Sequence, residues 1–265
     1  MSSMTKTAIL VVSFGTTFPG TRQKTIAATE AAIQQAYPDA TVFRAFTSNV
    51  VIKRIREKEQ IKIDTPSQAL HKIQQAGFTR VLVQSLHIIP GIEYQRLLSQ
   101  LAGYRDQFAE LIVGQPLLSD YSDYQWLVAQ LPKLTPNLAA DEGVLFMGHG
   151  TADNQFTAYA CLDHMLMGTR HYVGAVESYP DLTLELKRMQ QNGIKKVHLW
   201  PLMLVAGNHA TNDMSSTEPA SWRSQLEAHG FKTESHLVGL GELPAVQQRF
   251  TQHLQQALDK SNEGK

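Results

Sequence analysis

The apolar residues of this chain gather in short uninterrupted runs that alternate with segments of helical spacing. Runs rich in β-branched and aromatic residues are typical of parallel strands buried on both faces. Four such runs lie in the first half of the chain, at 8–12, 41–46, 81–89 and 112–117. Helical spacing is found at 21–35 and 66–76, and the second helix has Thr65 as N-cap, Pro66 at its first position and Gly77 as its stop.

The second half of the chain repeats this alternation. Its predicted strands are residues 144–147, 173–176, 197–205 and 233–238. A helix is expected at 181–191, stopped by Gly193, and a final amphipathic helix at 243–258. Strands that alternate with helices predict parallel sheets with right-handed crossovers.

The two halves are related by an internal repeat. Three segments recur in the same order, with offsets of 135, 130 and 116 residues between matched positions. At the predicted strand ends the matched residues are Phe14, Thr47 and Glu93 in the first half, and His149, Glu177 and His209 in the second. We therefore expect an α/β fold of two similar Rossmann-like domains with parallel sheets.

A proline-rich connection at 131–138 suggests where the domains divide. The first domain is expected to span residues 1–130, with the C-terminal helix at 243–265 packing back on it. The second domain is expected to span residues 131–242.

The candidate chemistry lies at the strand ends of the second half. Ligands of parallel α/β sheets bind beyond the carboxyl ends of the strands, where His149, Glu177 and His209 are expected. Two imidazoles and a carboxylate suit a borderline divalent metal with open coordination positions. Each residue alone is best interpreted as an ordinary loop residue, but three at matched strand ends favour a metal site. Glycines on both sides of His149 would allow a backbone or a flat ligand to approach closely.

Composition limits the other classes of function. Lys and Arg together number 24, as do Asp and Glu, so the zero net charge argues against a general nucleic-acid binder. No apolar run is long enough for a membrane span, and the N-terminal residues lack the pattern of a cleaved signal peptide. The single cysteine rules out an internal disulfide framework. A cytoplasmic location, without nucleic-acid or membrane partners, is expected.

Two other groups have alternative interpretations. Cys161 and His164 lie three residues apart on a predicted helix, where the cysteine is interpreted as core filling rather than as a metal ligand. The basic run at 53–58 fits either a solvated helix face or a contact for carboxylates.

Several motifs together resemble the anaerobic cobaltochelatases of the CbiK type. They are LVVSFGTT, FRAFTSNVVIKRIRE, IDTPSQAL, QSLHIIPGIEY, FMGHGTADNQFTAYACLDHM, GAVESYP and PLMLVAGNHATNDM. The resemblance implies the class II chelatase fold, two similar α/β domains with a cleft between them. It implies insertion of Co²⁺ into sirohydrochlorin with loss of two protons, in anaerobic cobalamin biosynthesis. His149, Glu177 and His209 would be the metal ligands and catalytic residues, and the proton-accepting role is assigned first to His149.

The substrate contacts are predicted on the first half of the chain. Phe14, Leu86, His87 and Ile88 are candidates to line an apolar wall, and Lys53, Arg54 and Arg56 to bind the peripheral carboxylates of sirohydrochlorin. Co²⁺ is expected as substrate metal, with no organic cofactor. The alternatives are a sirohydrochlorin ferrochelatase or nickel chelatase, because these ligands do not select among the ions, and a non-catalytic metal or tetrapyrrole carrier. A homo-oligomer is left open.

Overall fold

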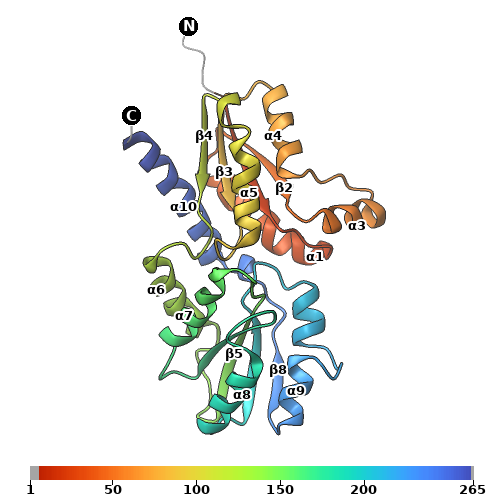
Figure 1. The fold of residues 1–265 in the computed structure, drawn as a ribbon, viewed down its shortest axis with the longest axis vertical. Coiled ribbons are helices and arrows are strands. Elements are labelled where there is room, and N and C mark those ends of the chain that lie inside the picture. Colours follow the sequence, from red (N-terminus) through yellow and green to blue (C-terminus); the bar gives the residue numbers. More distant parts are fainter. Residues whose placement is uncertain (1–5, 264–265) are drawn as a thin grey trace. The chain divides into compact units, whose positions relative to one another are not determined.

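The computed structural model describes residues 6–263, and its chain divides into two compact units. One unit comprises Met1–Ser119 with Gly241–Lys265, and the other comprises Asp120–Leu240. Each unit is built on a four-stranded sheet in which all neighbouring strands are parallel (Figure 1). The predicted fold class, an α/β protein with two parallel sheets, is confirmed.

The sheet of the first unit has the strand order β2-β1-β3-β4. Its strands are β1 (Thr7–Ser13), β2 (Thr41–Phe46), β3 (Arg80–Ser85) and β4 (Glu110–Gly114). The central strand β1 is apolar at every position from Ala8 to Val12, and these side chains are at most 1% exposed. A strand covered by helices on both faces needs such a continuous run, which explains the pattern read from the sequence.

Helices of the first unit cover its sheet. They are α1 (Pro19–Arg22), the π-helix η1 (Gln23–Ala27), α2 (Ala28–Ala36), α3 (Asn49–Glu59), α4 (Pro66–Gln75), α5 (Ile92–Ala102) and the short η2 (Arg105–Gln107). The predicted start of α4 is confirmed: the Thr65 hydroxyl accepts from the Gln68 N–H at 3.3 Å, and the Gln68 side chain accepts from the Thr65 N–H at 3.0 Å. This reciprocal pair satisfies two amide donors that the helix start would leave free.

The C-terminal helix α10 (Pro244–Glu263), which follows the short η6 (Leu240–Glu242), packs on α2 and β4 of the first unit (Figure 1). Val246, Phe250 and Leu254 of α10 are fully buried. At the far edge of this contact, the Tyr37 hydroxyl donates to Gln255 Oε1 at 2.9 Å. The amphipathic spacing of α10 therefore reflects burial of one face against this sheet.

The sheet of the second unit has the equivalent order, β6-β5-β7-β8. Its strands are β5 (Glu142–Gly148), β6 (His171–Ala175), β7 (Lys196–Pro201) and β8 (Lys232–Ser235). The helices are α6 (Tyr121–Gln130), η3 (Leu131–Leu134), η4 (Asn154–Phe156), α7 (Thr157–Met165), α8 (Leu182–Gln191), the π-helix η5 (Ala210–Met214) and α9 (Trp222–Ala228).

Four strands are shorter than predicted, and among them the strands expected at 112–117 and 233–238 end at Gly114 and Ser235. The runs at 81–89 and 197–205 end as strands at Ser85 and Pro201. The first residue after each of these two strands is apolar and buried outside the strand: Leu86 is 1% exposed and Leu202 is 0% exposed. Burial alone produced this pattern, since an apolar run does not distinguish a strand from a buried loop.

Strand pairing within each unit tests the repeat residue by residue. Leu86 N–H donates to Val12 O at 2.8 Å, and Leu202 N–H donates to Met147 O at 2.8 Å, in agreement with offsets of 116 and 135 residues. The alignment with an offset of 130 residues is wrong by one residue. Ser13 pairs with Phe46, whereas its counterpart Gly148 pairs with Ala175, which gives an offset of 129.

The corrected counterpart of Glu177 is therefore Ser48 rather than Thr47. Thr47 N–H donates to Ser13 O at 2.9 Å, as Val176 N–H does to Gly148 O at 3.0 Å. A shift of one residue matters here because neighbouring side chains of an extended segment point in opposite directions.

Candidate metal centre

Three side chains of the second unit converge at the carboxyl ends of adjacent strands. His149 directly follows β5, Glu177 lies two residues beyond β6, and His209 lies eight residues beyond β7, immediately before η5. Because β6, β5 and β7 are neighbours in the sheet, their ends bring the three residues together. One ligand atom from each residue lies within 4.8 Å of the others.

The two imidazoles meet through their Nε2 atoms, which are 3.1 Å apart, with the rings nearly perpendicular at 88°. His149 Nδ1 lies 3.1 Å from the carbonyl oxygen of Gly150, and His209 Nδ1 lies 2.6 Å from Asp213 Oδ2. Each of those partners is an acceptor, so a neutral ring in either position would favour the tautomer with its proton on Nδ1. Both Nε2 lone pairs then face the same point, an arrangement that a bound cation would complete.

Glu177 supplies the negative charge of the cluster. Its Oε2 lies 3.8 Å from His149 Nδ1, and its side chain is 56% exposed. The backbone holds the carboxylate near the imidazoles, because the Glu177 N–H donates to His149 O at 3.0 Å. A cation bound here would meet one formal negative charge and two neutral nitrogen donors.

Asp213 is a candidate positioning residue that the sequence reasoning missed. It lies four residues after His209 within η5, the spacing at which two side chains meet on one helix face. A carboxylate that accepts the Nδ1–H of an imidazole fixes the ring orientation and leaves Nε2 free for a metal. The i, i+4 pair of histidine and aspartate was the available signal.

The glycines beside His149 serve the packing of the protein itself. A Cβ at Gly148 would collide with the Tyr159 ring. Gly150 has a φ of +92°, and a Cβ there would lie 2.8 Å from Ser178 Oγ and 3.0 Å from the Glu177 nitrogen. Gly150 thus allows the close approach of a backbone, as expected. At both glycines, other atoms of the protein occupy the space where a Cβ would lie. That space is therefore not available to a flat ligand.

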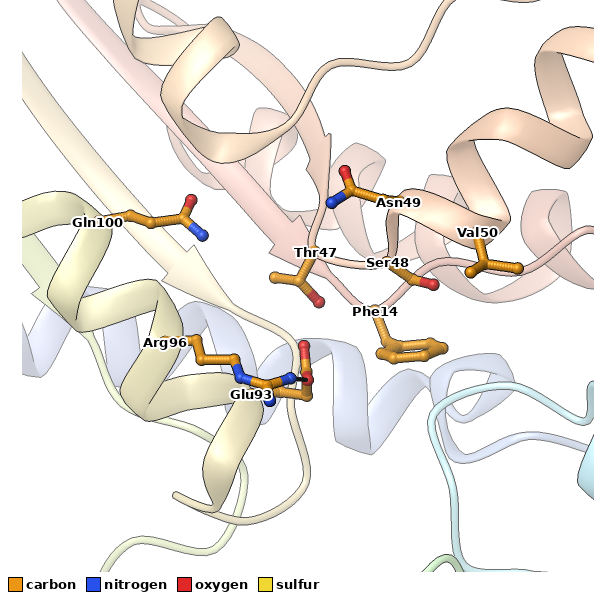
Figure 2. A pocket seen from close by; sticks show the side chains of 8 residues that line it. All are labelled: Phe14, Thr47, Ser48, Asn49, Val50, Glu93, Arg96 and Gln100. Atoms are coloured by element: carbon orange, nitrogen blue, oxygen red, sulfur yellow. Dashed lines mark hydrogen bonds and ion pairs between the residues drawn. The ribbon is translucent and has the colours of Figure 1, made fainter.

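The corresponding strand ends of the first unit surround a hollow of ≈ 340 Å³ (Figure 2). Its lining residues are Phe14, Thr47, Ser48, Asn49, Val50, Glu93, Arg96 and Gln100. Phe14 occupies the position equivalent to His149 and is 49% exposed. Glu93, equivalent to His209, is paired with Arg96 at 2.6 Å. An apolar ring and a charge-paired carboxylate do not provide the donors of the second unit.

The residues predicted on the loop after β3 have different environments. Leu86 is only 1% exposed, so the prediction that it lines a substrate wall is wrong; its N–H still donates to Val12 O of β1, and its side chain belongs to the core. His87 and Ile88 are half-buried. The Nδ1 of His87 lies 2.8 Å from Ser85 Oγ, and burial lowers the pKa of His87 to about 4. His87 is therefore neutral near pH 7.

The basic residues of α3 are exposed. Arg54 and Arg56 are accessible on the helix, and Lys53 lies 3.8 Å from Glu57 one turn away. Lys53 and Arg56 also line a separate hollow of ≈ 470 Å³. These exposed side chains can reach an anionic group.

Cys161 is exposed, so its interpretation as core filling is wrong. It lies on a solvent-facing position of α7, next to buried Leu162. Neither Cys161 nor His164 belongs to a potential metal cluster within residues 6–263. Over the same residues, no helix combines the length and apolar character that crossing a membrane requires.

The fold and the convergent histidines define an α/β protein with a candidate transition-metal centre, and comparison with known proteins gives its family. The model of the family described as "Cobalt chelatase (CbiK)" matches residues 7–259. The chain belongs to this family of cobalt chelatases, as the sequence motifs predicted.

Two relatives match over almost their full length. The sirohydrochlorin cobaltochelatase of Salmonella typhimurium is 45% identical over 260 residues, covering 97% of this chain and 98% of the relative. The sirohydrochlorin cobaltochelatase CbiKC of Nitratidesulfovibrio vulgaris is 36% identical over 263 residues, covering 96% of this chain and 92% of the relative. Among solved structures, SirB from Bacillus subtilis with Fe³⁺ has a TM-score of 0.66 at 14% identity, over 97% of this chain and 98% of that one. This last likeness concerns the fold alone.

Proposed function

We propose that the protein is a sirohydrochlorin cobaltochelatase, which inserts Co²⁺ into sirohydrochlorin as two pyrrolic protons leave. Two relatives with this name, at 45% and 36% identity, support the reaction and the substrate. The observation that carries the site assignment is the pair of Nε2 atoms 3.1 Å apart, each on a ring whose Nδ1 faces an acceptor.

The metal-binding step uses His149, Glu177 and His209. The two imidazoles offer nitrogen donors that suit Co²⁺, and the Glu177 carboxylate lowers the net charge of the ion as it loses water. Three protein ligands leave coordination positions open for the ring nitrogens of the substrate. Asp213 holds the His209 ring so that its Nε2 stays directed at the metal.

The proton-accepting step follows as the metal moves to the macrocycle. Each imidazole that releases the metal regains a free Nε2 lone pair, and imidazoles accept protons near neutral pH. His149 is assigned the first proton. The second proton is assigned to His209, whose Nε2 lies 3.1 Å from that of His149. Two imidazoles thus match the two protons that the reaction releases.

The substrate contacts form a separate part of the proposal. The exposed ring of Phe14 and the half-buried His87 and Ile88 are proposed to contact the apolar macrocycle. The exposed guanidinium groups of Arg54 and Arg56 are proposed to bind its carboxylates, for which their planar donors are well suited.

An anoxic metallation assay tests the proposed reaction. The absorbance change of sirohydrochlorin with Co²⁺ is followed with the protein, without protein and with His149→Ala. We expect a large acceleration by the wild type that His149→Ala abolishes. Tight binding without acceleration would identify a carrier and contradict the proposal. Repeating the assay with Fe²⁺ and Ni²⁺ then establishes the metal preference.

We also propose that the chain has two folding domains, with α10 belonging to the first; the compact units divide between Ser119 and Asp120, ahead of the boundary expected at 130. The packing of α10 on α2 and β4 supports this assignment. The cytoplasm is the proposed location, which cell fractionation tests.

A further inference from the structure

A second group of histidines lies on β7 and the edge strand β8 of the same sheet. His198 is in the middle of β7, Glu234 is in β8, and His236 directly follows β8. His198 pairs in register with Glu234, and the His236 N–H donates to Leu199 O at 2.9 Å, so the edge strand continues alongside β7. Because side chains two residues apart share a face, Glu234 and His236 project on the same side. This group shares no residue with His149, Glu177 and His209.

The three side chains have the spacing of metal ligands. His198 Nδ1 and His236 Nε2 are 3.0 Å apart. The Glu234 carboxylate lies 3.8 Å from His198 Nδ1 and 3.6 Å from His236 Nε2. The 3.8 Å distance is to Oε2 and the 3.6 Å distance is to Oε1, and one ligand atom from each of the three residues lies within 4.8 Å of the others. Zn²⁺ binds imidazole nitrogen and carboxylate oxygen at about 2.0–2.2 Å.

The surroundings hold both imidazoles in place. His198 is 8% exposed, and the Trp200 ring stacks on His236 with centroids 4.5 Å apart and an interplanar angle of 14°. His198 Nε2 is buried without a hydrogen bond and lies 3.6 Å from Glu142 Oε2. A small shift of the Glu142 carboxylate would let it accept the Nε2–H of His198, and this tautomer would leave Nδ1 free for a cation.

Lys196 forms ion pairs with Glu234 and Glu142, so it would compete with a bound cation for the Glu234 carboxylate. Its ammonium lies 2.7 Å from Glu234 Oε2 and 3.3 Å from Glu142 Oε1. A simple surface ion-pair cluster would be complete with Lys196 and the two glutamates. In such a cluster the two imidazoles would form only the hydrogen bond between His198 Nδ1 and His236 Nε2, whose atoms are 3.0 Å apart. The lysine would weaken cation binding through charge repulsion and through competition for Glu234.

We propose that His198, Glu234 and His236 form a second binding site for a divalent transition-metal ion such as Zn²⁺. The bound ion would join the short edge strand β8 to β7, and so stabilise the end of the sheet. This role is independent of the proposed chelatase activity, since none of its ligands belongs to the proposed catalytic site.

Titration calorimetry with Zn²⁺ tests the site in a full-length His149→Ala/His209→Ala variant, which removes the first cluster. We expect one equivalent of Zn²⁺ to bind. Adding His236→Ala should weaken that binding at least ~10-fold, and the exposed near-isosteric change Glu234→Gln should also weaken it. His229→Ala, an exposed histidine of the same unit, is the matched control and should leave binding unchanged.

Removing the positive charge of Lys196 should change the affinity for Zn²⁺ in the opposite direction. Lys196→Met in the same background should tighten Zn²⁺ binding several-fold and increase the rise in melting temperature that Zn²⁺ produces. No Zn²⁺ binding in the His149→Ala/His209→Ala variant, or binding unaffected by both His236→Ala and Glu234→Gln in proteins with wild-type circular dichroism, would overturn the proposal. His236→Ala in the otherwise wild-type protein should retain chelatase activity, which separates this test from that of the proposed function.

Discussion

His149 and His209 face each other through Nε2 atoms 3.1 Å apart, although the two residues are separated by 60 positions in the sequence. The contact brings together two nitrogen lone pairs, because each Nδ1 is engaged by an acceptor, Gly150 O for His149 and Asp213 for His209. In the absence of a shared proton or cation, such a contact is repulsive. The local structure therefore predisposes this point of the sheet to bind a positive charge.

Asp213→Asn should weaken Co²⁺ binding by about 10–100-fold while preserving the shape of the side chain. The amide cannot accept the His209 Nδ1–H as strongly as the carboxylate does, so the ring loses its fixed tautomer and part of its basicity. Equilibrium titration with Co²⁺ measures the change, and Asn212→Ala on the exposed side of the same π-helix is the control. Equal affinities for Asp213→Asn and the wild type would show that Asp213 does not position His209.

Gly150→Ala should destabilise the protein more than Gly168→Ala does. Both glycines have positive φ, +92° and +81°, which costs a residue with Cβ roughly 1 kcal/mol. At Gly168 the added Cβ meets open space, whereas at Gly150 it lies 2.8 Å from Ser178 Oγ and 3.0 Å from the Glu177 nitrogen. We expect an additional loss of about 1–3 kcal/mol for Gly150→Ala, from the overpacking at that contact.

Chemical denaturation of both glycine variants measures this difference. Because Gly150→Ala also displaces Glu177, its affinity for Co²⁺ should fall while that of Gly168→Ala stays at the wild-type value. Equal losses of stability in the two variants would exclude the contact with the Glu177 loop as a cause.

His87 should make the folded state less stable at acidic pH. Burial lowers the pKa of His87 from 6.5 to about 4, so the unfolded chain takes up a proton at this residue at a higher pH than the folded protein does. The free energy of unfolding therefore decreases as the pH falls from about 6.5 to 4, by up to about 3 kcal/mol from this group.

Unfolding experiments between pH 7.5 and about 4 compare the wild type with His87→Gln. The substitution changes the absolute stability by removing the contact with Ser85, so the slope against pH is the informative quantity. We expect a smaller loss of stability with acidification in His87→Gln. Parallel curves for the two proteins would show that His87 is not the responsible group.

Arg54→Gln/Arg56→Gln should raise the KM for sirohydrochlorin several-fold and leave kcat almost unchanged, if these exposed side chains bind carboxylates of the substrate. The effect should shrink at high salt, because ions screen exposed charges. Lys58→Gln, in the otherwise wild-type protein, removes a different exposed positive charge of α3 and serves as the control for overall charge. An unchanged KM in the double variant would remove Arg54 and Arg56 from the substrate site.

The sequence pattern was most informative where burial and element type coincide. The run at 41–46 became β2 with the same bounds, and Thr65 caps α4 as predicted. The repeat also identified the three strand ends at which His149, Glu177 and His209 converge. Parallel topology makes the ends of neighbouring strands meet at one edge, so positions distant in sequence could be placed together without coordinates.

The pattern was least informative where burial occurs outside regular structure. Leu86 was predicted to lie in a strand and to contact a ligand, yet it follows the end of β3 and its side chain is buried in the core. The prediction failed because an apolar residue indicates burial but not backbone conformation. The alignment of Thr47 with Glu177 was wrong by one residue, because identical residues, Ala45 with Ala175 and Ser48 with Ser178, favoured that register, whereas strand pairing gives another. Asp213 was missed because its role depends on the direction of the His209 ring.

A single-turnover transfer experiment tests most directly whether the metal held by His149, Glu177 and His209 is the metal that is inserted. The protein carries His236→Ala, so that the second histidine group does not bind the ion, and it is loaded anoxically with one equivalent of Co²⁺. It is then mixed with metal-free sirohydrochlorin and an excess of a chelator that traps free Co²⁺. We predict that cobalt-sirohydrochlorin forms at a rate independent of the chelator, and that His209→Ala in the same background forms none. Complete suppression by the chelator in the loaded parent protein would contradict the account, because the inserted ion would then come from solution.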